Sequence, residues 1–382
     1  MGKLALTGGA PLRDKKWPSW PVYDGAEREA LSRVQASGVF RGGNEARAFA
    51  AAYADFCGAR CCIPVANGTV SIELILRALG IGRGDEVILP PYTFIASYSA
   101  ICFAGATPVF ADISPVDYNL DAAAVERVIT PRTRAILAVS VGGRPADYDA
   151  LSDVARRRGL ALIGDAAQAA GARFNGTDIA ALGTAASISC QNSKNLTCGE
   201  GGLITTNDEA LYNTLTAMLS GGDDRHLSLD SGISEFGAAI LSSQLTRLPA
   251  QMETRSENAA YLDELLSALG FVAPLPADPR VTRNAYHLYF VRVLEDKLGV
   301  SRNAFIRAVA AEGVPITTGY EPLYTFPGIK EPHDCPTTDR IAAHEASWIT
   351  QNALLAGRED MRDIARAMEK VYDCIDELRE VE

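Results

Sequence analysis

The sequence lacks long hydrophobic runs, has few histidines and carries no excess of positive charge. Its 382 residues include 36 Lys and Arg against 47 Asp and Glu, for a formal net charge of −11, and 4 His. A negative surface repels phosphate backbones and anionic lipids, so we expect neither nucleic acid nor a membrane as partner. No segment approaches the roughly 18 uncharged apolar residues of a membrane span, and the first residues lack the apolar part of a signal peptide. These absences favour a cytoplasmic protein.

Motifs for metals and nucleotides are also missing. The 8 cysteines form no Cys-x-x-Cys pair, so we expect no metal site, and their places within apolar runs are typical of reduced thiols. No GxxxxGK[ST] motif occurs. Gly80-Ile81-Gly82-Arg83-Gly84 follows a helical stretch and precedes a strand, the reverse of a dinucleotide fingerprint, and predicts a helix end with a turn. A nicotinamide oxidoreductase stays an alternative that fits the α/β pattern but lacks this fingerprint.

Between residues 60 and 206 the chain alternates short apolar runs with Ala-rich stretches of helical periodicity. Nearly continuous apolar strands separated by helices indicate an α/β domain with a mostly parallel sheet covered on both faces. The predicted strands are Cys62–Val65, Glu86–Leu89, Thr107–Asp112, Ala135–Val141, Leu160–Gly164, Ala186–Ser189 and Gly202–Thr206. The predicted helices between them include Val70–Leu79, Ala122–Val128 and Asp147–Arg158. Six or seven strands form one large domain.

The rest of the chain predicts an α+β appendage. A polar break at Gly221–Arg225 precedes a long amphipathic stretch, Ile233–Leu266. Further on we expect a strand at Tyr286–Val293, a helix at Ser301–Glu312, a strand-like run into Tyr320 and a final helix at Arg358–Arg379. We therefore predict an irregular arm over residues 1–20, a large domain over 21–260 and a smaller C-terminal domain over 261–382.

Three polar positions stand at the ends of predicted strands. Asn67-Gly68-Thr69 opens a helix, where free N–H groups hold phosphate, although an ordinary N-cap by Thr69 is an alternative. Asp165 ends a parallel strand, where α/β sheets bind ligands, and its alternative is a capping carboxylate. Lys194 lies between a strand and a glycine-rich turn. A buried lysine there can form a Schiff base with a carbonyl, whereas the alternative is a solvated loop lysine.

Seven segments, in order, resemble the pyridoxal phosphate sugar and aminocyclitol aminotransferases of the DegT/StrS family, which have fold type I. The segments are Ala66-Asn67-Gly68-Thr69, Gly82-x-Gly84-Asp85-Glu86-Val87-Ile88, Pro91-Tyr92-Thr93-Phe94, Ala106-Thr107-Pro108-Val109-Phe110, Thr130-Pro131-Arg132-Thr133-Arg134-Ala135-Ile136, Asp165-Ala166-Ala167-Gln168 and Gly199-Glu200-Gly201-Gly202. The resemblance implies a large seven-stranded sheet, a smaller C-terminal domain and a pyridoxal phosphate-dependent transaminase.

The resemblance also implies a role for each matching residue. Lys194 would form the Schiff base with pyridoxal phosphate and move the proton during transamination. Asp165 would keep the pyridine nitrogen protonated, and Gln168 would bind the cofactor's 3-oxygen. Phe94 would stack on the ring. Three residues would hold the phosphate: Gly68, Thr69 and Ser189.

Within the family, the chain is most similar to the branch of scyllo-inosose and 2-deoxy-scyllo-inosose aminotransferases and 3-amino-5-hydroxybenzoate synthases. The run Ser189–Gly202 and the arm motifs Gly8–Pro11 and Trp17–Pro21 carry this similarity. Tyr324, where sugar-nucleotide members often have His, marks a substrate residue and favours a free cyclic ketone. The branch implies antibiotic or other secondary metabolism, with glutamine or glutamate as amino donor, and a homodimer whose active sites each borrow segment 223–240.

Several positions depart from the family pattern. Asp230 replaces an Asn that reaches the neighbouring subunit's phosphate, so the carboxylate would turn away, meet a cation or leave the task to another residue. Ser140 and Thr350-Gln351 stand where histidines are usual. Two alternatives remain: a dehydratase of the same family, which would have His in place of Lys194, and a non-catalytic protein of the same fold.

Overall fold

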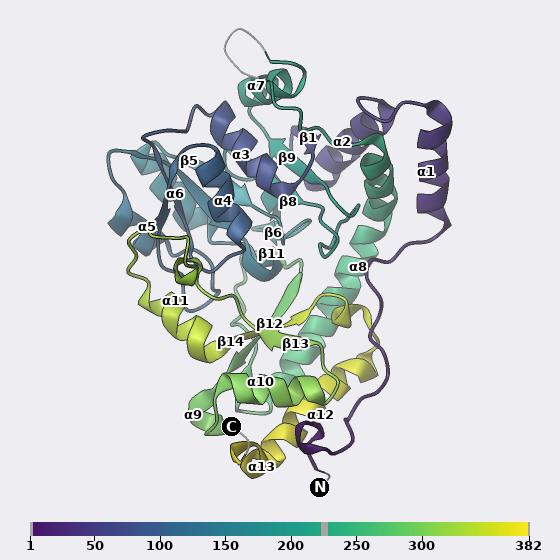
Figure 1. Ribbon diagram of the computed structural model, residues 1–382, viewed down its shortest axis with the longest axis vertical. Coiled ribbons are helices and arrows are strands. Elements are labelled where there is room, and N and C mark those ends of the chain that lie inside the picture. Colours follow the sequence, from purple (N-terminus) through teal and green to yellow (C-terminus); the bar gives the residue numbers. More distant parts are fainter. Residues whose placement is uncertain (1–2, 223–227, 381–382) are drawn as a thin grey trace.

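One long helix, α8 (Glu235–Ser267), joins two hydrophobic cores in the computed structural model, which describes residues 3–222 and 228–380 (Figure 1). The first half of α8 packs Leu241, Leu248 and Met252 into the core of the large sheet. Its second half places Leu262 and Leu266 in the core of the C-terminal part. Because both cores bury one face of the same helix, α8 holds the two parts together.

The large sheet has seven strands in the order β1-β9-β8-β5-β4-β2-β3. Pairing is parallel except on both sides of β9, which runs against β1 and β8. The strands are β1 (Cys61–Val65), β2 (Glu86–Leu89), β3 (Thr107–Phe110), β4 (Thr133–Val139), β5 (Ala161–Asp165), β8 (Ala185–Ser189) and β9 (Gly202–Thr206). The predicted α/β class and the seven strands are confirmed.

Helices cover both faces of this sheet because alternate strand residues point to opposite sides. Ile136 belongs to one core with α2 (Asn44–Cys57), α5 (Ala122–Val128), α6 (Tyr148–Arg158) and α8. Its neighbour Leu137 belongs to the other core, with α3 (Gly68–Ala78), α4 (Ile95–Phe103) and α7 (Glu209–Leu219). The N-terminal helix α1 (Gly25–Ser37) packs against α8 (Figure 1).

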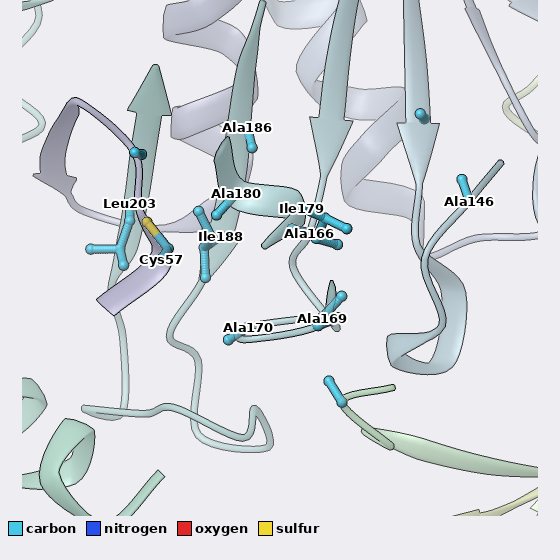
Figure 2. Packing of buried hydrophobic residues seen from close by; sticks show 14 of the residues in the cluster. Cys57, Ala146, Ala166, Ala169, Ala170, Ile179, Ala180, Ala186, Ile188 and Leu203 are labelled. Atoms are coloured by element: carbon cyan, nitrogen blue, oxygen red, sulfur yellow. The ribbon is translucent and has the colours of Figure 1, made fainter. Parts of the chain in front are cut away.

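Small side chains anchor the loop that follows β5. Figure 2 shows Ala166, Ala169 and Ala170 in the same buried cluster as Ile188 and Leu203 of the neighbouring strands. All three alanines are at most 5% exposed. Their burial fixes the backbone that follows Asp165 and so holds the polar side chains of this loop at the sheet edge.

The C-terminal part is built on a four-stranded antiparallel sheet, in the order β10-β12-β14-β13. Its strands are β10 (Val272–Ala273), β12 (Leu288–Val293), β13 (Ile316–Thr318) and β14 (Ala346–Thr350). Helices α9 (Glu295–Leu298), α10 (Arg302–Ala311), α11 (Pro336–Arg340), α12 (Arg358–Asp373) and α13 (Ile375–Arg379) complete it, with a π-helical turn at Ile341–Glu345. The predicted single helix over Arg358–Arg379 was wrong, because the chain leaves helical geometry at Cys374.

A three-stranded sheet connects segments far apart in the sequence. It consists of β6 (Arg173–Phe174), β7 (Thr177–Asp178) and β11 (Val281–Arg283). The N-terminal arm also joins distant parts: Leu4 is fully buried in the C-terminal core, and Figure 1 shows the arm running from there to α1. The boundaries at residues 20 and 260 stay a prediction. Among the described residues, no helix has the length and apolar character to cross a membrane.

Candidate active site

A cavity of about 600 Å3 opens at the edge of the sheet where β5 and β8 end. The reversed direction of β9 places the loop from β8 to β9 at this edge, because Ser189 and Gly202 pair in register. Every cofactor residue implied by the resemblance lines the cavity: Gly68, Thr69, Phe94, Asp165, Gln168, Ser189 and Lys194. The fold therefore gathers residues that lie up to 126 positions apart in the sequence, from 68 to 194.

Lys194 lies in the loop from β8 to β9, where it makes no side-chain hydrogen bond or ion pair with any described residue. Burial lowers its pKa to about 8, against the opposing effect of the Asp165 charge. A far larger fraction of such an amine is uncharged near neutral pH than of an ordinary lysine, whose pKa is about 10.4. The site thus supplies a nucleophilic amine at neutral pH.

The loop around Lys194 is fixed from outside the cavity. The Trp20 indole N–H of the arm donates to the Asn192 carbonyl at 3.1 Å. Buried Asn195 donates from Nδ2 to the Ala285 carbonyl at 2.7 Å. Because these bonds come from the arm and from the segment before β12, both ends of the chain help to place the lysine.

Asp165 faces the same cavity and is 4% exposed. The Ser97 hydroxyl donates to its Oδ2 at 2.7 Å, and the Ala167 N–H donates to its Oδ1 at 3.1 Å. Burial raises its pKa, although both hydrogen bonds and the Lys194 charge act in the opposite direction. A carboxylate held in this way can stabilise a protonated nitrogen in the cavity.

A cradle for an anion lies at the N-terminus of α3. The Asn67 side chain caps this helix by accepting from the Val70 N–H at 2.9 Å, so the alternative that Thr69 is the cap was wrong. The helix begins one residue before Thr69, which leaves the Gly68 and Thr69 N–H groups and the Thr69 hydroxyl without partners in the described part of the chain. Such N–H groups at the positive end of a helix dipole bind phosphate.

Two glycines make this cradle possible. A Cβ on Gly68 would lie 2.9 Å from the Ser189 Cβ, and a Cβ on Gly202 would lie 2.4 Å from the Asn67 backbone. The close approach brings the Ser189 hydroxyl beside the first turn of α3. Glycine at both positions therefore serves packing rather than flexibility.

Gln168 and Phe94 complete the predicted set. Gln168 accepts from the Gly142 N–H at 2.8 Å and donates from Nε2 to the Tyr320 hydroxyl at 3.1 Å, so its amide orientation is fixed and one N–H remains. Phe94 lines the cavity with 55% of its surface exposed. An exposed apolar ring at a cavity mouth offers a stacking surface.

Several cavity residues, Ser97 among them, were not predicted from the sequence, and two of these come from distant segments. His287, 7% exposed, and Tyr320 both come from the C-terminal part of the chain. His287 Nδ1 lies 3.2 Å from Asn195 Oδ1. The one available signal was a polar residue at the start of the apolar run Tyr286–Val293, and that pattern alone does not indicate a site.

Tyr324 does not lie in this cavity of the single chain. Its hydroxyl donates to Asp339 at 2.6 Å, and its ring stacks on His333 with 3.8 Å between centroids. Its assignment as a substrate residue stays a prediction. Asp230 forms an exposed ion pair with Arg41, so a cation does accompany this carboxylate within the chain.

The other departures from the family pattern also have definite places. Ser140 is buried directly after β4, where its hydroxyl lies beside the buried Tyr148 hydroxyl. Gln351 accepts from the Arg255 Nε at 3.1 Å. Neither residue lines the cavity. Over the described residues there is also no cluster of three or more metal-binding side chains.

The cavity fits pyridoxal phosphate at three separate points. The N-terminus of α3 with Ser189 suits a phosphate, Asp165 suits a protonated ring nitrogen, and Lys194 supplies an amine for the aldehyde. The observation that decides the fit is the cradle, since two N–H groups and a hydroxyl lack partners where glycines allow close approach.

Comparisons with known proteins agree with this geometry. The model of the DegT/DnrJ/EryC1/StrS aminotransferase family matches residues 21–369. The chain is 37% identical to the L-glutamine:scyllo-inosose aminotransferase of Streptomyces griseus, over 98% of this chain and 99% of that protein. It is also 37% identical to the L-glutamine:2-deoxy-scyllo-inosose aminotransferase of Micromonospora echinospora, over 99% and 100% of the two chains. The crystal structure of 3-amino-5-hydroxybenzoic acid synthase superposes with a TM-score of 0.87 at 34% identity, over 94% and 98%.

Proposed function

This chain belongs to the DegT/DnrJ/EryC1/StrS aminotransferase family, and we propose that it moves the amino group of L-glutamine to a ring ketone of the cyclitol class. It is a pyridoxal phosphate-dependent aminotransferase. The observation that carries the substrate proposal is identity of 37% over nearly the whole of two relatives whose names specify glutamine and an inosose. We infer glutamine ahead of glutamate as donor for the same reason.

When bound, pyridoxal phosphate supplies an aldehyde that reacts with amines and a ring that takes up electrons from the carbon losing its proton. We assign the residues around it accordingly. Lys194 holds the cofactor and, once free, carries the proton to and from the substrate carbon. Asp165 keeps negative charge opposite the ring nitrogen. The remaining N–H of Gln168 binds the ring oxygen, and Phe94 covers the ring face.

Phosphate binding in this assignment depends on neutral groups. The overall charge of −11 opposes an anion, so the free N–H groups of Gly68 and Thr69 and the hydroxyls of Thr69 and Ser189 must supply the attraction. The residue at position 194 separates this function from the dehydratase alternative. A dehydratase of this family would have His at position 194, whereas this chain has Lys194 with a lowered pKa.

We further propose a homodimer whose partner closes the cavity. Phe94 at the cavity mouth and Phe40 near α2 are each more than half exposed, and Phe40 packs on Phe236 of α8. We expect the second copy of the chain to cover these two rings. Part of the segment proposed to cross between subunits, residues 223–227, lies outside the described residues. Light scattering should give twice the mass of one chain, and a fully active monomer would contradict this assembly.

The substrate proposal is tested with a panel of acceptors. Purified enzyme loaded with pyridoxal phosphate is incubated with cyclitol ketones, free keto sugars and nucleotide-linked keto sugars, each with glutamine or glutamate, and products are identified by mass spectrometry. We expect amination of cyclitol ketones with glutamine as the better donor. Conversion of nucleotide-linked sugars alone would contradict the proposal.

A further inference from the structure

The hydrogen bonds around His287 fix which of its ring nitrogens carries the proton. Asn195 donates from Nδ2 to the Ala285 carbonyl, which leaves its Oδ1 to face the His287 Nδ1 at 3.2 Å. An amide oxygen only accepts, so the His287 Nδ1 must donate. In the neutral ring, Nε2 is then a bare acceptor.

The bare nitrogen opens on the active-site cavity. His287 lines the cavity, and no described residue forms a hydrogen bond with its Nε2. This nitrogen is also not one of the fully buried polar atoms without a partner, so it is accessible from the cavity. Two cations, Lys194 and Arg255, lie close enough to His287 to add to the effect of burial, and together they hold its pKa well below the usual value. The ring therefore stays neutral when substrate binds.

We propose that His287 is a specificity-determining residue whose Nε2 accepts a hydrogen bond from a hydroxyl group of the ring ketone. This inference rests on the proposed cyclitol function. It gives the cavity a fixed acceptor that recognises the amine acceptor, on the side of the site formed by the C-terminal part of the chain.

The charges around His287 select a hydroxyl over the groups of the amino donor. Arg255 repels a donor's ammonium group, and a carboxylate has no proton to give to a bare nitrogen. A hydroxyl is neutral and can donate. A cyclitol ketone carries several hydroxyls, so it can donate the hydrogen bond that no described residue gives to Nε2.

The protonation state is tested without any reaction. The full-length protein is labelled with 15N in its 4 histidines, and the His287 signals are assigned by their loss in a His287→Gln variant. We expect one protonated nitrogen, Nδ1, and one bare nitrogen, Nε2, with no titration between pH 6 and 9. A proton on Nε2, or a charged ring at pH 7, would overturn the inference.

The specificity role is tested with two variants of different length. His287→Asn can still donate to Asn195 but ends short of the Nε2 position, whereas His287→Gln places an amide oxygen near that position. Each is assayed as the loaded enzyme with scyllo-inosose and its single-deoxy counterparts. We expect the wild type to prefer scyllo-inosose over one deoxy ketone by about 10- to 100-fold in kcat/KM.

The two variants should then separate recognition from folding. In His287→Asn, the ratio of the kcat/KM values for scyllo-inosose and the deoxy ketone should fall close to one, because only the amination of scyllo-inosose becomes slower. His287→Gln should restore part of this ratio. Equal losses with all ketones, or recovery with Asn rather than Gln, would show a structural role and overturn the inference. A wild-type enzyme that aminates no ring ketone would instead overturn the proposed function itself.

Discussion

Buried charge is treated in opposite ways in the cavity and around Glu345, at the end of the π-helical turn Ile341–Glu345. Glu345, 6% exposed, accepts from the Tyr118 hydroxyl at 2.9 Å and the Arg292 Nε at 2.6 Å, and it pairs with Arg340. In the cavity, Lys194 has no side-chain partner among the described residues, and Asp165 receives one hydroxyl and one N–H.

The pKa values follow this difference. Burial alone would raise the pKa of Glu345, but its arginine and tyrosine partners bring it below the usual value. In the cavity burial prevails, so the pKa of Asp165 is raised and that of Lys194 falls to about 8. Charges with full partners stabilise the fold, whereas charges without them are kept available for a ligand.

The largest expected effect comes from removing the cavity carboxylate. Asp165→Asn keeps the shape but removes the charge opposite the ring nitrogen, and we expect transamination to fall by about 10^3-fold or more. Cofactor should remain attached to Lys194, as judged by the visible spectrum. Because the folded protein disfavours the charged form of Asp165, the cofactor-free variant should unfold at no lower urea concentration than wild type. Near-normal turnover would contradict the role of Asp165.

For a paired carboxylate we expect a loss of stability instead. Glu345→Gln removes the negative charge and one of the two acceptor oxygens that Arg292 and Arg340 share. We expect a loss of about 2 kcal/mol in the free energy of unfolding, less than for a fully buried pair because both arginines reach solvent. Urea titration measures it, with Glu359→Gln on the surface of α12 as a control that should show a clearly smaller loss, because its ion pairs are exposed.

The stability lost in Glu345→Gln should depend on pH. Since the folded pKa of Glu345 is lowered, its contribution is present above the unfolded value of about 4.3 and is lost as the pH falls through the folded value. The difference between wild type and Glu345→Gln should therefore shrink below about pH 4. A constant difference down to pH 3 would show that the ion pair is not its source.

Replacing Lys194 should have a smaller effect and should raise the stability of the cofactor-free protein. The unfolded chain binds more protons than the folded one between pH 8 and 10.5, so wild-type stability without cofactor should rise with pH there. Lys194→Met should lack this rise and be more stable at pH 7. The shift sets an upper bound of about 3 kcal/mol, and we expect about 1–2 because the cavity admits solvent. Parallel pH profiles for the two proteins would contradict the lowered pKa.

The smallest effect concerns the phosphate cradle. Thr69→Val removes one hydroxyl from the N-terminus of α3, and we expect cofactor affinity to weaken about five- to tenfold. Equilibrium dialysis of the cofactor-free enzyme measures this change. The control, Thr214→Val, removes a hydroxyl that bonds within α7 and should leave affinity unchanged. Equal affinities for all three proteins would place the phosphate elsewhere.

The large sheet could be predicted because its strands are continuous apolar runs. β2 and β9 begin and end at the predicted residues, as does α5. The small sheet of β6, β7 and β11 could not, since two- and three-residue strands show no periodicity and Phe174 pairs with Val281, more than a hundred residues away. The break at Cys374 was missed because apolar spacing continues through it.

The site residues that directly follow a strand could be predicted from the sequence. Asp165 and Gly68 were singled out because they follow strands at the carboxyl edge of the sheet, where ligands bind. Lys194 was singled out by the family resemblance, since a loop lysine alone is usually solvated. His287 and Tyr320 reach the cavity only through packing of the C-terminal part against that edge, which no local pattern records. The cap at Asn67 rather than Thr69 was open for another reason, since both residue types are good N-caps.

If Lys194 binds pyridoxal phosphate, chemical reduction should fix the cofactor on this residue alone. The purified protein is loaded with the cofactor, reduced with borohydride, digested and mapped by mass spectrometry, beside Lys194→Ala treated in the same way. We predict a single pyridoxyl group on the peptide that contains Lys194 and none in the variant. A pyridoxyl group on another lysine, or one retained by Lys194→Ala, would contradict the account.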